Sequence, residues 1–208
     1  PPEDVPGVEL SGLLGEGSTG TVYRGQHRPT GREVAVKVFR LGPGDSGFDQ
    51  ARFEWECAIA REVFGGMPVQ VGWCYGQNLE MNALEYHKGI EVNGCVTDVV
   101  LLVGDANDIT WAQDIRYETS RVAAFYAPAG SVVEFHCWNL HYAPIHVAQG
   151  GDFLTLVYLP KGTNEALPFT FAKEGENRLL FAVNKWLLAH PELAGLKAQG
   201  AYPGLVGP

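Results

Sequence analysis

Residues 85–91 combine the side-chain types that bind metal ions in proteins. The segment EYHKGIEVN contains Glu85, His87 and Glu91, all at odd positions. Side chains alternate between two faces along an extended chain, so we expect these three on one face of a strand or hairpin. Burying two carboxylates and an imidazole among apolar residues is costly unless a cation compensates them. Because carboxylate and imidazole ligands suit Mn, Fe, Ni, Co or Zn, the predicted cofactor is a divalent metal ion.

Three histidines in a later segment are candidates for a further ligand: His136, His141 and His146. In the run SVVEFHCWNLH, alternation places His141 on the face of the apolar residues that begin the run, which is the inward face. His141 is therefore the favoured ligand. His136 shares its face with Glu134 and is expected to point outward, while His146 follows a proline and its direction is open. Both remain alternates.

The carboxylates of this segment also suit proton transfer. We predict a metal site formed by Glu85, His87, Glu91 and His141, with catalytic roles for Glu85 and Glu91. A metal ion polarises a carbonyl, and a carboxylate that the ion does not fully engage moves the proton. Glu85 is either a ligand or this base, and both roles stay open.

A second pattern, near the start of the chain, is typical of phosphate binding. The stretch GEGSTGTV spaces Gly15, Gly17 and Gly20 as G-x-G-x-x-G-x-V, and the stretch VAVK ends at Lys37. Glycines let backbone N–H groups approach a phosphate, and a lysine on the next strand pairs with its charge. If this protein binds a nucleotide, we expect these four residues to contact its phosphates.

Residues 8–40 thus resemble the start of a protein kinase N-lobe. The chain lacks an HRD-type catalytic loop and an APE motif, and 208 residues leave no room for the second lobe that carries the catalytic base and the metal-binding carboxylates. We therefore expect no active kinase and no ATP as cofactor. A catalytically dead, kinase-like nucleotide-binding fragment is one alternative function.

The elements that must position these residues read mainly as strands. The chain has 26 glycines and 13 prolines, which separate many short apolar runs and favour an all-β, mainly antiparallel fold. We expect an irregular proline-rich start over 1–7, a β-meander over 8–48, a connecting helix over 49–66 and a β-barrel over 67–208. A C-terminal helix is expected over 178–189, where apolar residues recur at helical spacing.

Charge and cysteine usage narrow the classes of protein. A net charge of −9 disfavours nucleic acids and anionic membranes as partners, and no apolar run is long enough to span a membrane. Four scattered cysteines without a C-x-x-C pair indicate free thiols in a reducing compartment, so we expect a cytoplasmic protein. The first residues, PPEDVPG, match neither a signal peptide nor a natural start.

The predicted metal site resembles the cupin motifs. Cupins carry H-x-H-x3/4-E between glycines, and here Glu85-x-His87-x3-Glu91 lies between Gly76 and Gly94, with Glu85 in place of the first histidine. The second cupin motif is matched by Pro128-Ala129-Gly130. His141 follows this motif later than usual, whereas His136 lies closer to the usual spacing.

More closely, residues 62–208 resemble a family of small bacterial cupins of unassigned function, similar in fold to lyxose-isomerase-type sugar isomerases. The stretches that carry the likeness include GGMPVQVGWCYGQNLEMNALEYHKGIEVN, TDVVLLVGDANDI and LLFAVNKWLLAHPE. The resemblance implies a double-stranded β-helix or jelly-roll barrel, a homodimer, and metal-dependent aldose–ketose isomerisation of a small sugar or polyol-like substrate. A non-enzymatic sugar- or metal-binding cupin is the other alternative. Residues 1–61 depart from the family pattern, so a join of unrelated segments near 50–62 is also open.

Overall fold

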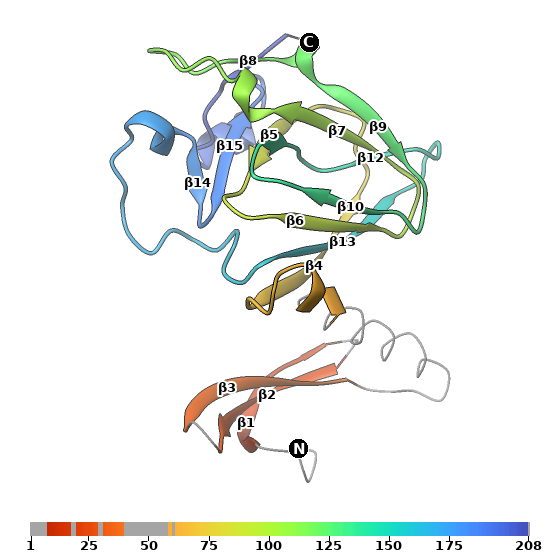
Figure 1. Ribbon diagram of the computed structural model, residues 1–208, viewed down its shortest axis with the longest axis vertical. Coiled ribbons are helices and arrows are strands. Elements are labelled where there is room, and N and C mark those ends of the chain that lie inside the picture. The colour runs from red at the N-terminus through yellow and green to blue at the C-terminus, as the bar shows by residue number, and fades with distance from the viewer. Residues whose placement is uncertain (1–7, 18–19, 29–30, 40–57, 60, 208) are drawn as a thin grey trace. The chain divides into compact units, whose positions relative to one another are not determined.

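The computed structural model describes residues 8–17, 20–28, 31–39, 58–59 and 61–207 (Figure 1). The chain divides into two compact units, Pro1–Ile59 and Ala60–Pro208. Each unit has its own hydrogen-bonded sheets, and each is described by itself.

The first unit contains a three-stranded antiparallel meander of β1 (Val8–Gly17), β2 (Gly20–His27) and β3 (Arg32–Phe39), in the order β1-β2-β3. This is the meander that the alternating sequence predicts. Gly17 pairs with Gly20 where β1 meets β2, and Lys37 pairs through its backbone with Val22. Residues 18–19 of the glycine-rich stretch lie outside the described residues.

The predicted connecting helix over 49–66 is described only at its end. Residues 58–59 and 61–62 are helical, and the chain turns at residues 63–66, where Gly65 and Gly66 have φ of 57° and 82°. Such positive values favour glycine, which ends helices for this reason. Residues 49–57 lie outside the described part of the chain.

The second unit is built mainly from antiparallel strands, and its first sheet has the order β10-β6-β13-β4. Its members are β4 (Val69–Gly76), β6 (Glu91–Cys95), β10 (Val132–Phe135) and β13 (Phe153–Pro160). The long strands β4 and β13 pair along their whole length, from Val69 with Pro160 to Gly76 with Phe153. Apolar alternation bounded by glycine and proline predicted both of these strands.

A second sheet is centred on β7 (Val99–Asp105). One edge of β7 pairs with β9 (Ala123–Ala127). Because Val99 and Val100 pair with both β9 and β12 (Ile145–His146), β12 must use the opposite edge, and β11 (Asn139–Leu140) pairs with the far end of β7. Figure 1 shows β7 and β9 on one side of this unit and β10, β6 and β13 on the other.

A third sheet, in the order β14-β15-β5, contains β5 (Ala83–Tyr86), β14 (Leu180–Ala182) and β15 (Lys185–Ala189). The remaining elements are short: η1 (Ala106–Asp108), β8 (Tyr117–Glu118), η2 (Thr119–Arg121), η3 (Gly175–Arg178), α2 (Ala194–Ala198) and β16 (Leu205–Val206). β16 pairs in parallel with β8 and so ties the end of the described chain to the sheet region.

The core forms because β5 is buried on both of its faces. Leu84 is fully buried and packs in a cluster with Tyr117, Leu140 and Leu188. Ala83, on the other face, packs with residues of β15. Removing a side chain such as Leu84 from this core by substitution with alanine would cost about 2–5 kcal/mol of stability.

The predicted helix over 178–189 is wrong, because this segment forms η3 and the β14–β15 hairpin. The turn of the hairpin contains Asn184 at φ 56°, a left-handed conformation that asparagine tolerates better than most residues. The apolar positions fit either a helix or a strand, and pairing of β15 with β5 decides between them. The helix that follows, α2, has five residues.

Candidate metal centre

The first three residues of the candidate centre come from β5, from β6 and from the short connection between these two strands, which belong to different sheets. Glu85 lies in β5, His87 directly follows that strand, and Glu91 begins β6. All three are buried, with exposed fractions of 8%, 1% and 6% respectively. Alternation along the two strands, as the sequence predicts, turns these polar side chains to the same interior.

His141 is brought to this interior by a backbone bridge to β5. The Glu85 N–H donates to the His141 carbonyl at 2.7 Å, and the His141 N–H donates to the Glu85 carbonyl at 3.0 Å. The sequence predicted one continuous strand that ends at His141. This was partly wrong, because the strand is interrupted between β10 and β11. Cys137, which alternation in the run SVVEFHCWNLH would place on the same face as His141, is exposed. His141 nevertheless lies in the interior, 4% exposed.

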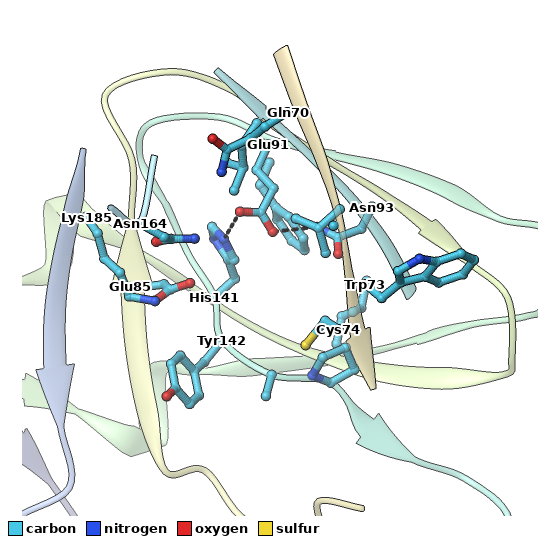
Figure 2. Close-up of a pocket in the computed structure, with 17 residues that line it drawn as sticks. Gln70, Trp73, Cys74, Glu85, Glu91, Asn93, His141, Tyr142, Asn164 and Lys185 are labelled. Atoms are coloured by element: carbon cyan, nitrogen blue, oxygen red, sulfur yellow. Dashed lines mark hydrogen bonds and ion pairs between the residues drawn. The ribbon is translucent and has the colours of Figure 1, made fainter. Parts of the chain in front are cut away.

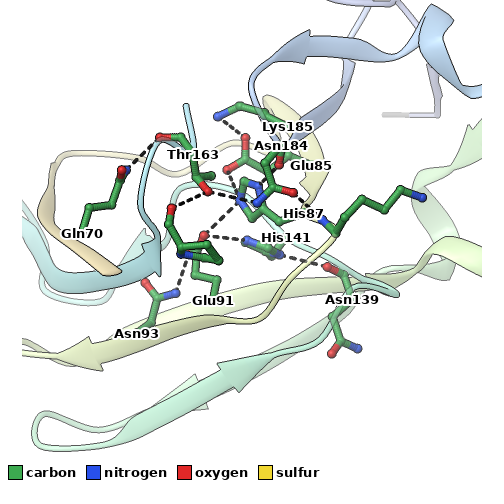
Figure 3. A network of polar contacts seen from close by, with 12 residues as sticks. Gln70, Glu85, His87, Glu91, Asn93, Asn139, His141, Thr163, Asn184 and Lys185 are labelled. Atoms are coloured by element: carbon green, nitrogen blue, oxygen red, sulfur yellow. Dashed lines mark hydrogen bonds and ion pairs between the residues drawn. The ribbon is translucent and has the colours of Figure 1, made fainter. Parts of the chain in front are cut away.

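These four side chains form one compact cluster, shown in Figure 3, in which the potential ligand atoms all lie within 4.8 Å of one another. Glu91 Oε2 is 3.1 Å from His87 Nε2 and 3.4 Å from His141 Nε2. Glu85 Oε1 is 3.8 Å from His87 Nε2. Two carboxylates and two imidazoles so placed could hold a metal ion.

Backbone carbonyls fix the orientation of both imidazoles. His87 Nδ1 lies 2.6 Å from the Asn184 carbonyl oxygen, and His141 Nδ1 lies 2.9 Å from the Asn139 carbonyl oxygen. A carbonyl only accepts, so each Nδ1 carries the proton and each Nε2 lone pair faces the cluster in the neutral ring. Neither Nε2 atom has a hydrogen-bond partner. Nitrogen lone pairs that face carboxylate oxygens need a proton or a metal cation between them, and metal-binding histidines are commonly held in this way.

The electrostatics of the cluster favour ionised Glu91. Burial raises the pKa of this carboxyl, but the charges of the adjacent His141 and His87 outweigh burial and hold the pKa far below its ordinary value. Burial lowers the pKa of His141, while the negative charges of Glu91 and Glu85 raise it, with a net increase. The cluster therefore retains a negative carboxylate that draws cations.

A cavity of about 340 Å³ opens beside the cluster (Figure 2). Its walls come from β4, β5, β6, β7, β10, β13, β15 and the segment that begins at His141. Asn93 lies in the wall and donates from Nδ2 to Glu91 Oε1 at 2.7 Å. Lys185 reaches the cavity from β15 and forms an ion pair with Glu85 Oε2.

Cys74, in the same cavity wall, is a thiol near the two carboxylates. Burial raises the pKa of this thiol, and the charges of Glu91 and Glu85 raise it further. Cys74 is therefore a neutral thiol at neutral pH, and it contributes no charge to the cavity.

The alternate histidines lie outside the cluster. His136 is about half exposed, stacks on Trp138 at a centroid distance of 4.8 Å and lies 3.4 Å from Glu134. His146 is buried, and its Nδ1 accepts a hydrogen bond from the Asn78 N–H at 3.0 Å. The predicted nucleotide-binding residues Gly15, Gly17, Gly20 and Lys37 belong to the other unit.

Two residues at the centre were missed from the sequence, Asn184 and Lys185. Both fall in the segment that was predicted as a helix, whereas the structure forms a hairpin there that pairs with β5. Asn184 holds His87 through its carbonyl, and its side chain accepts from the Lys88 N–H at 2.8 Å and donates to Thr163 Oγ1 at 3.0 Å. Asn184 between two apolar runs is a local turn signal, since asparagine tolerates the left-handed conformation of such turns.

Fold and centre together define a mainly antiparallel β protein with a buried carboxylate–imidazole cluster beside a cavity. The chain belongs to the family described as Domain of unknown function (DUF4867), whose family model matches residues 49–208. This confirms the predicted membership in a family of unassigned function, and the match begins earlier than the resemblance stated for 62–208. No curated protein and no solved structure matches the chain. The likeness to cupins and sugar isomerases, and that of residues 8–40 to kinases, stay predictions.

Two further sequence expectations meet structural findings. Cys74, Cys95 and Cys137 are free thiols, and Cys57 lies outside the described residues. Within the described ranges, no helix has both the length and the apolar composition that crossing a membrane requires.

Proposed function

We propose that this chain is a metal-dependent protein of the cupin type that acts on a small sugar or polyol-like substrate, as an aldose–ketose isomerase does. One observation carries the proposal. His87 and His141 each present a buried Nε2 atom without a hydrogen-bond partner to the same carboxylate, Glu91. This donor set suits a divalent Mn, Fe, Ni, Co or Zn ion.

The surrounding sheets support the cupin interpretation. The sheet β10-β6-β13-β4 supplies Glu91, whereas β5 and the segment after β11 supply the other ligands. A site enclosed between antiparallel sheets is what a jelly-roll or double-stranded β-helix barrel provides. The cavity beside the cluster gives a small ligand access to it.

The contacts of the two carboxylates favour different roles for them. Glu91 uses Oε1 to accept from Asn93 and directs Oε2 at both histidines, so it acts as a ligand. Glu85 has one oxygen toward His87 and the other at Lys185, on the border of the cavity. We assign Glu85 the proton transfer between the two adjacent carbons of the substrate. A bound divalent ion would polarise the carbonyl and stabilise the enediolate.

Elemental analysis after mild purification tests the metal site. We expect about one equivalent of a divalent metal in the wild type and loss of metal in the double variant His87→Ala/His141→Ala. The matched control is His136→Ala, which removes a histidine outside the cluster and should leave the metal content unchanged. Stoichiometric metal that survives in the double variant would contradict the assignment.

Turnover tests the enzymatic part of the proposal. Metal-loaded protein is incubated with a panel of pentoses and hexoses, and interconversion of aldose and ketose is followed by chromatography. We expect turnover that Glu85→Gln abolishes while metal content is kept. Absence of turnover across the panel, in protein that holds its metal, would exclude the isomerase and leave a non-enzymatic sugar- or metal-binding protein.

A further inference from the structure

Lys185 places an ammonium group inside the cavity that borders the cluster. Lys185 begins β15, and alternation puts it on the face of Leu187, which pairs with Glu85. Its side chain is 15% exposed, and its Nζ contacts Glu85 Oε2 (Figure 3). The ring centre of Tyr142 lies 5.7 Å from Nζ.

This ammonium retains the capacity to bind a second partner. A lysine ammonium carries three N–H donors, and the ion pair with one oxygen of Glu85 does not use all of them. The same carboxylate directs its other oxygen toward His87 in the cluster. Glu85 therefore holds Lys185 next to the position where the imidazoles and carboxylates converge.

Charge in the cavity depends on the metal ion. Of the 17 residues that line the cavity, all within the described part of the chain, Lys185 is the only lysine or arginine. The charges of Glu85, Glu91 and Lys185 sum to −1 without metal and to +1 when a divalent ion is bound, so the metal-loaded cavity carries a net positive charge although Lys185 stays paired with Glu85. A partly buried positive charge attracts an anionic ligand strongly, because few water molecules screen it.

The remaining polar walls of the cavity suit hydroxyl groups. Asn93, Asn164 and Tyr142 carry neutral amide or phenol groups, and Figure 2 shows Asn164 and Tyr142 near Lys185 and Glu85. Burial and the charge of Glu85 raise the pKa of Tyr142, so its hydroxyl stays a donor at neutral pH. A volume of about 340 Å³ lies at the lower end of the range for small-molecule sites.

We propose that the metal-loaded cavity binds a small polyhydroxy carboxylate, a sugar acid, in preference to a neutral sugar, and that Lys185 selects for the carboxylate. The ammonium donates to the carboxylate, while the amide and phenol groups contact the hydroxyls. This inference rests on the proposed function, because the positive charge of the cavity arises with the bound divalent ion.

Isothermal titration calorimetry on the full chain loaded with Mn²⁺ tests the inference. The probes are two acids, D-glucuronate and glycolate, each paired with its neutral amide, D-glucuronamide and glycolamide. Amide and acid have nearly the same shape, so the comparison isolates the charge. We expect at least one acid to bind tenfold or more tightly than its amide, because hydrogen bonds between charged groups are stronger than those between neutral groups.

Variants assign this preference to Lys185. Lys185→Met should reduce the affinity for the acid to that for the amide, whereas Lys185→Arg, which keeps the charge, should retain a preference for the acid. Lys161→Met, at an exposed position outside the cavity, is the matched control and should bind like the wild type. Metal content and a thermal melt are measured on each variant, so that loss of binding is separated from loss of folding.

The outcomes distinguish this inference from the proposed function. Protein that holds its metal but binds neither acid more tightly than its amide would overturn the inference and leave the metal site standing. An acid preference that persists in folded, metal-loaded Lys185→Met would also overturn it. Protein that takes up no metal would remove both proposals together. Because the comparison of acid with amide is made first on the wild type, it holds even if Lys185→Met fails to fold.

Discussion

Asn184 stabilises the candidate metal centre indirectly, through a hydrogen bond to one of its histidines, His87. Its carbonyl accepts from His87 Nδ1 and thereby directs Nε2 at Glu91, and its side chain closes the hairpin turn through contacts with Lys88 and Thr163. Asn184 is thus a positioning residue, because it acts on the cluster only through His87. Its φ of 56° makes this position sensitive to the residue type.

We predict different outcomes for two substitutions of Asn184. Both remove the side-chain hydrogen bonds, but alanine also suffers the left-handed backbone, which costs about 1–2 kcal/mol more. Asn184→Ala should therefore lower the free energy of unfolding further than Asn184→Gly, and urea denaturation measures the difference. Metal affinity should fall by roughly 10–100-fold in the alanine variant, as is usual when the partner of a metal-bound histidine shifts. A glycine variant less stable than the alanine variant would contradict the role of the turn.

At the scale of elements, the sequence predicted strands well where turns bound them. Glycine and proline mark both ends of the runs that form β4 and β13, so their positions followed from local signals. The β14–β15 hairpin could not be predicted in this way. Its apolar residues fit helical spacing, and its strand character depends on pairing with β5, about 100 residues earlier in the chain.

The difference between local sequence signals and long-range strand pairing also decided which site residues could be predicted from the sequence. Glu85, His87 and Glu91 lie close together in the sequence, on two consecutive strands and their connection, so alternation gathered them. The direction of His141 was inferred correctly although its strand is interrupted. Lys185 depends on the long-range pairing of β15 and was therefore missed.

Close packing between β7 and the core predicts a strong effect of one methyl group. A Cβ atom at Gly104 would lie 2.4 Å from the Tyr117 hydroxyl oxygen and 3.4 Å from Leu140. Tyr117 is fully buried, so it cannot move aside, and Gly104→Ala should destabilise the fold by roughly 1–3 kcal/mol. Thermal and urea unfolding measure this loss.

Two controls locate the origin of that loss. Tyr117→Phe removes the oxygen atom, so Gly104→Ala should cost less in that background than in the wild type. Gly72→Ala in β4 adds the same methyl group where no atom lies within 4 Å, and it should leave stability nearly unchanged. Equal destabilisation by the two alanine substitutions would show that strand propensity, not packing against Tyr117, limits position 104.

At the scale of the whole molecule, the candidate metal centre and the glycine-rich pattern lie in different units of the chain. The cluster, its supporting carbonyls and the cavity all belong to the unit from Ala60 to Pro208, which lies within the residues that the DUF4867 family model matches. The kinase-like glycine pattern belongs to the other unit. The described residues on which the proposed metal-binding function rests thus all belong to the second unit.

The stability of the whole protein should depend on pH in opposite ways with and without metal. In the metal-free protein, the pKa of Glu91 lies below its ordinary value of 4.5, so its stabilising contribution is lost as the pH falls below that value. The pKa of His141 lies above its ordinary value of 6.5, so its contribution is lost as the pH rises from there. Chelator-treated protein should thus have its highest Tm between these two values.

Metal binding should reverse the loss of stability that the metal-free protein shows as the pH rises above 6.5. A divalent ion requires neutral imidazoles and competes with protons for them, so its stabilising effect grows as the pH rises. The difference in Tm between metal-loaded and chelator-treated protein should therefore be larger at pH 8 than at pH 5.5, as differential scanning calorimetry in matched buffers would measure. The variant His87→Ala/His141→Ala should lose this difference, whereas His136→Ala should keep it. A difference that stays constant with pH in the wild type would mean that the ion binds elsewhere than at these imidazoles.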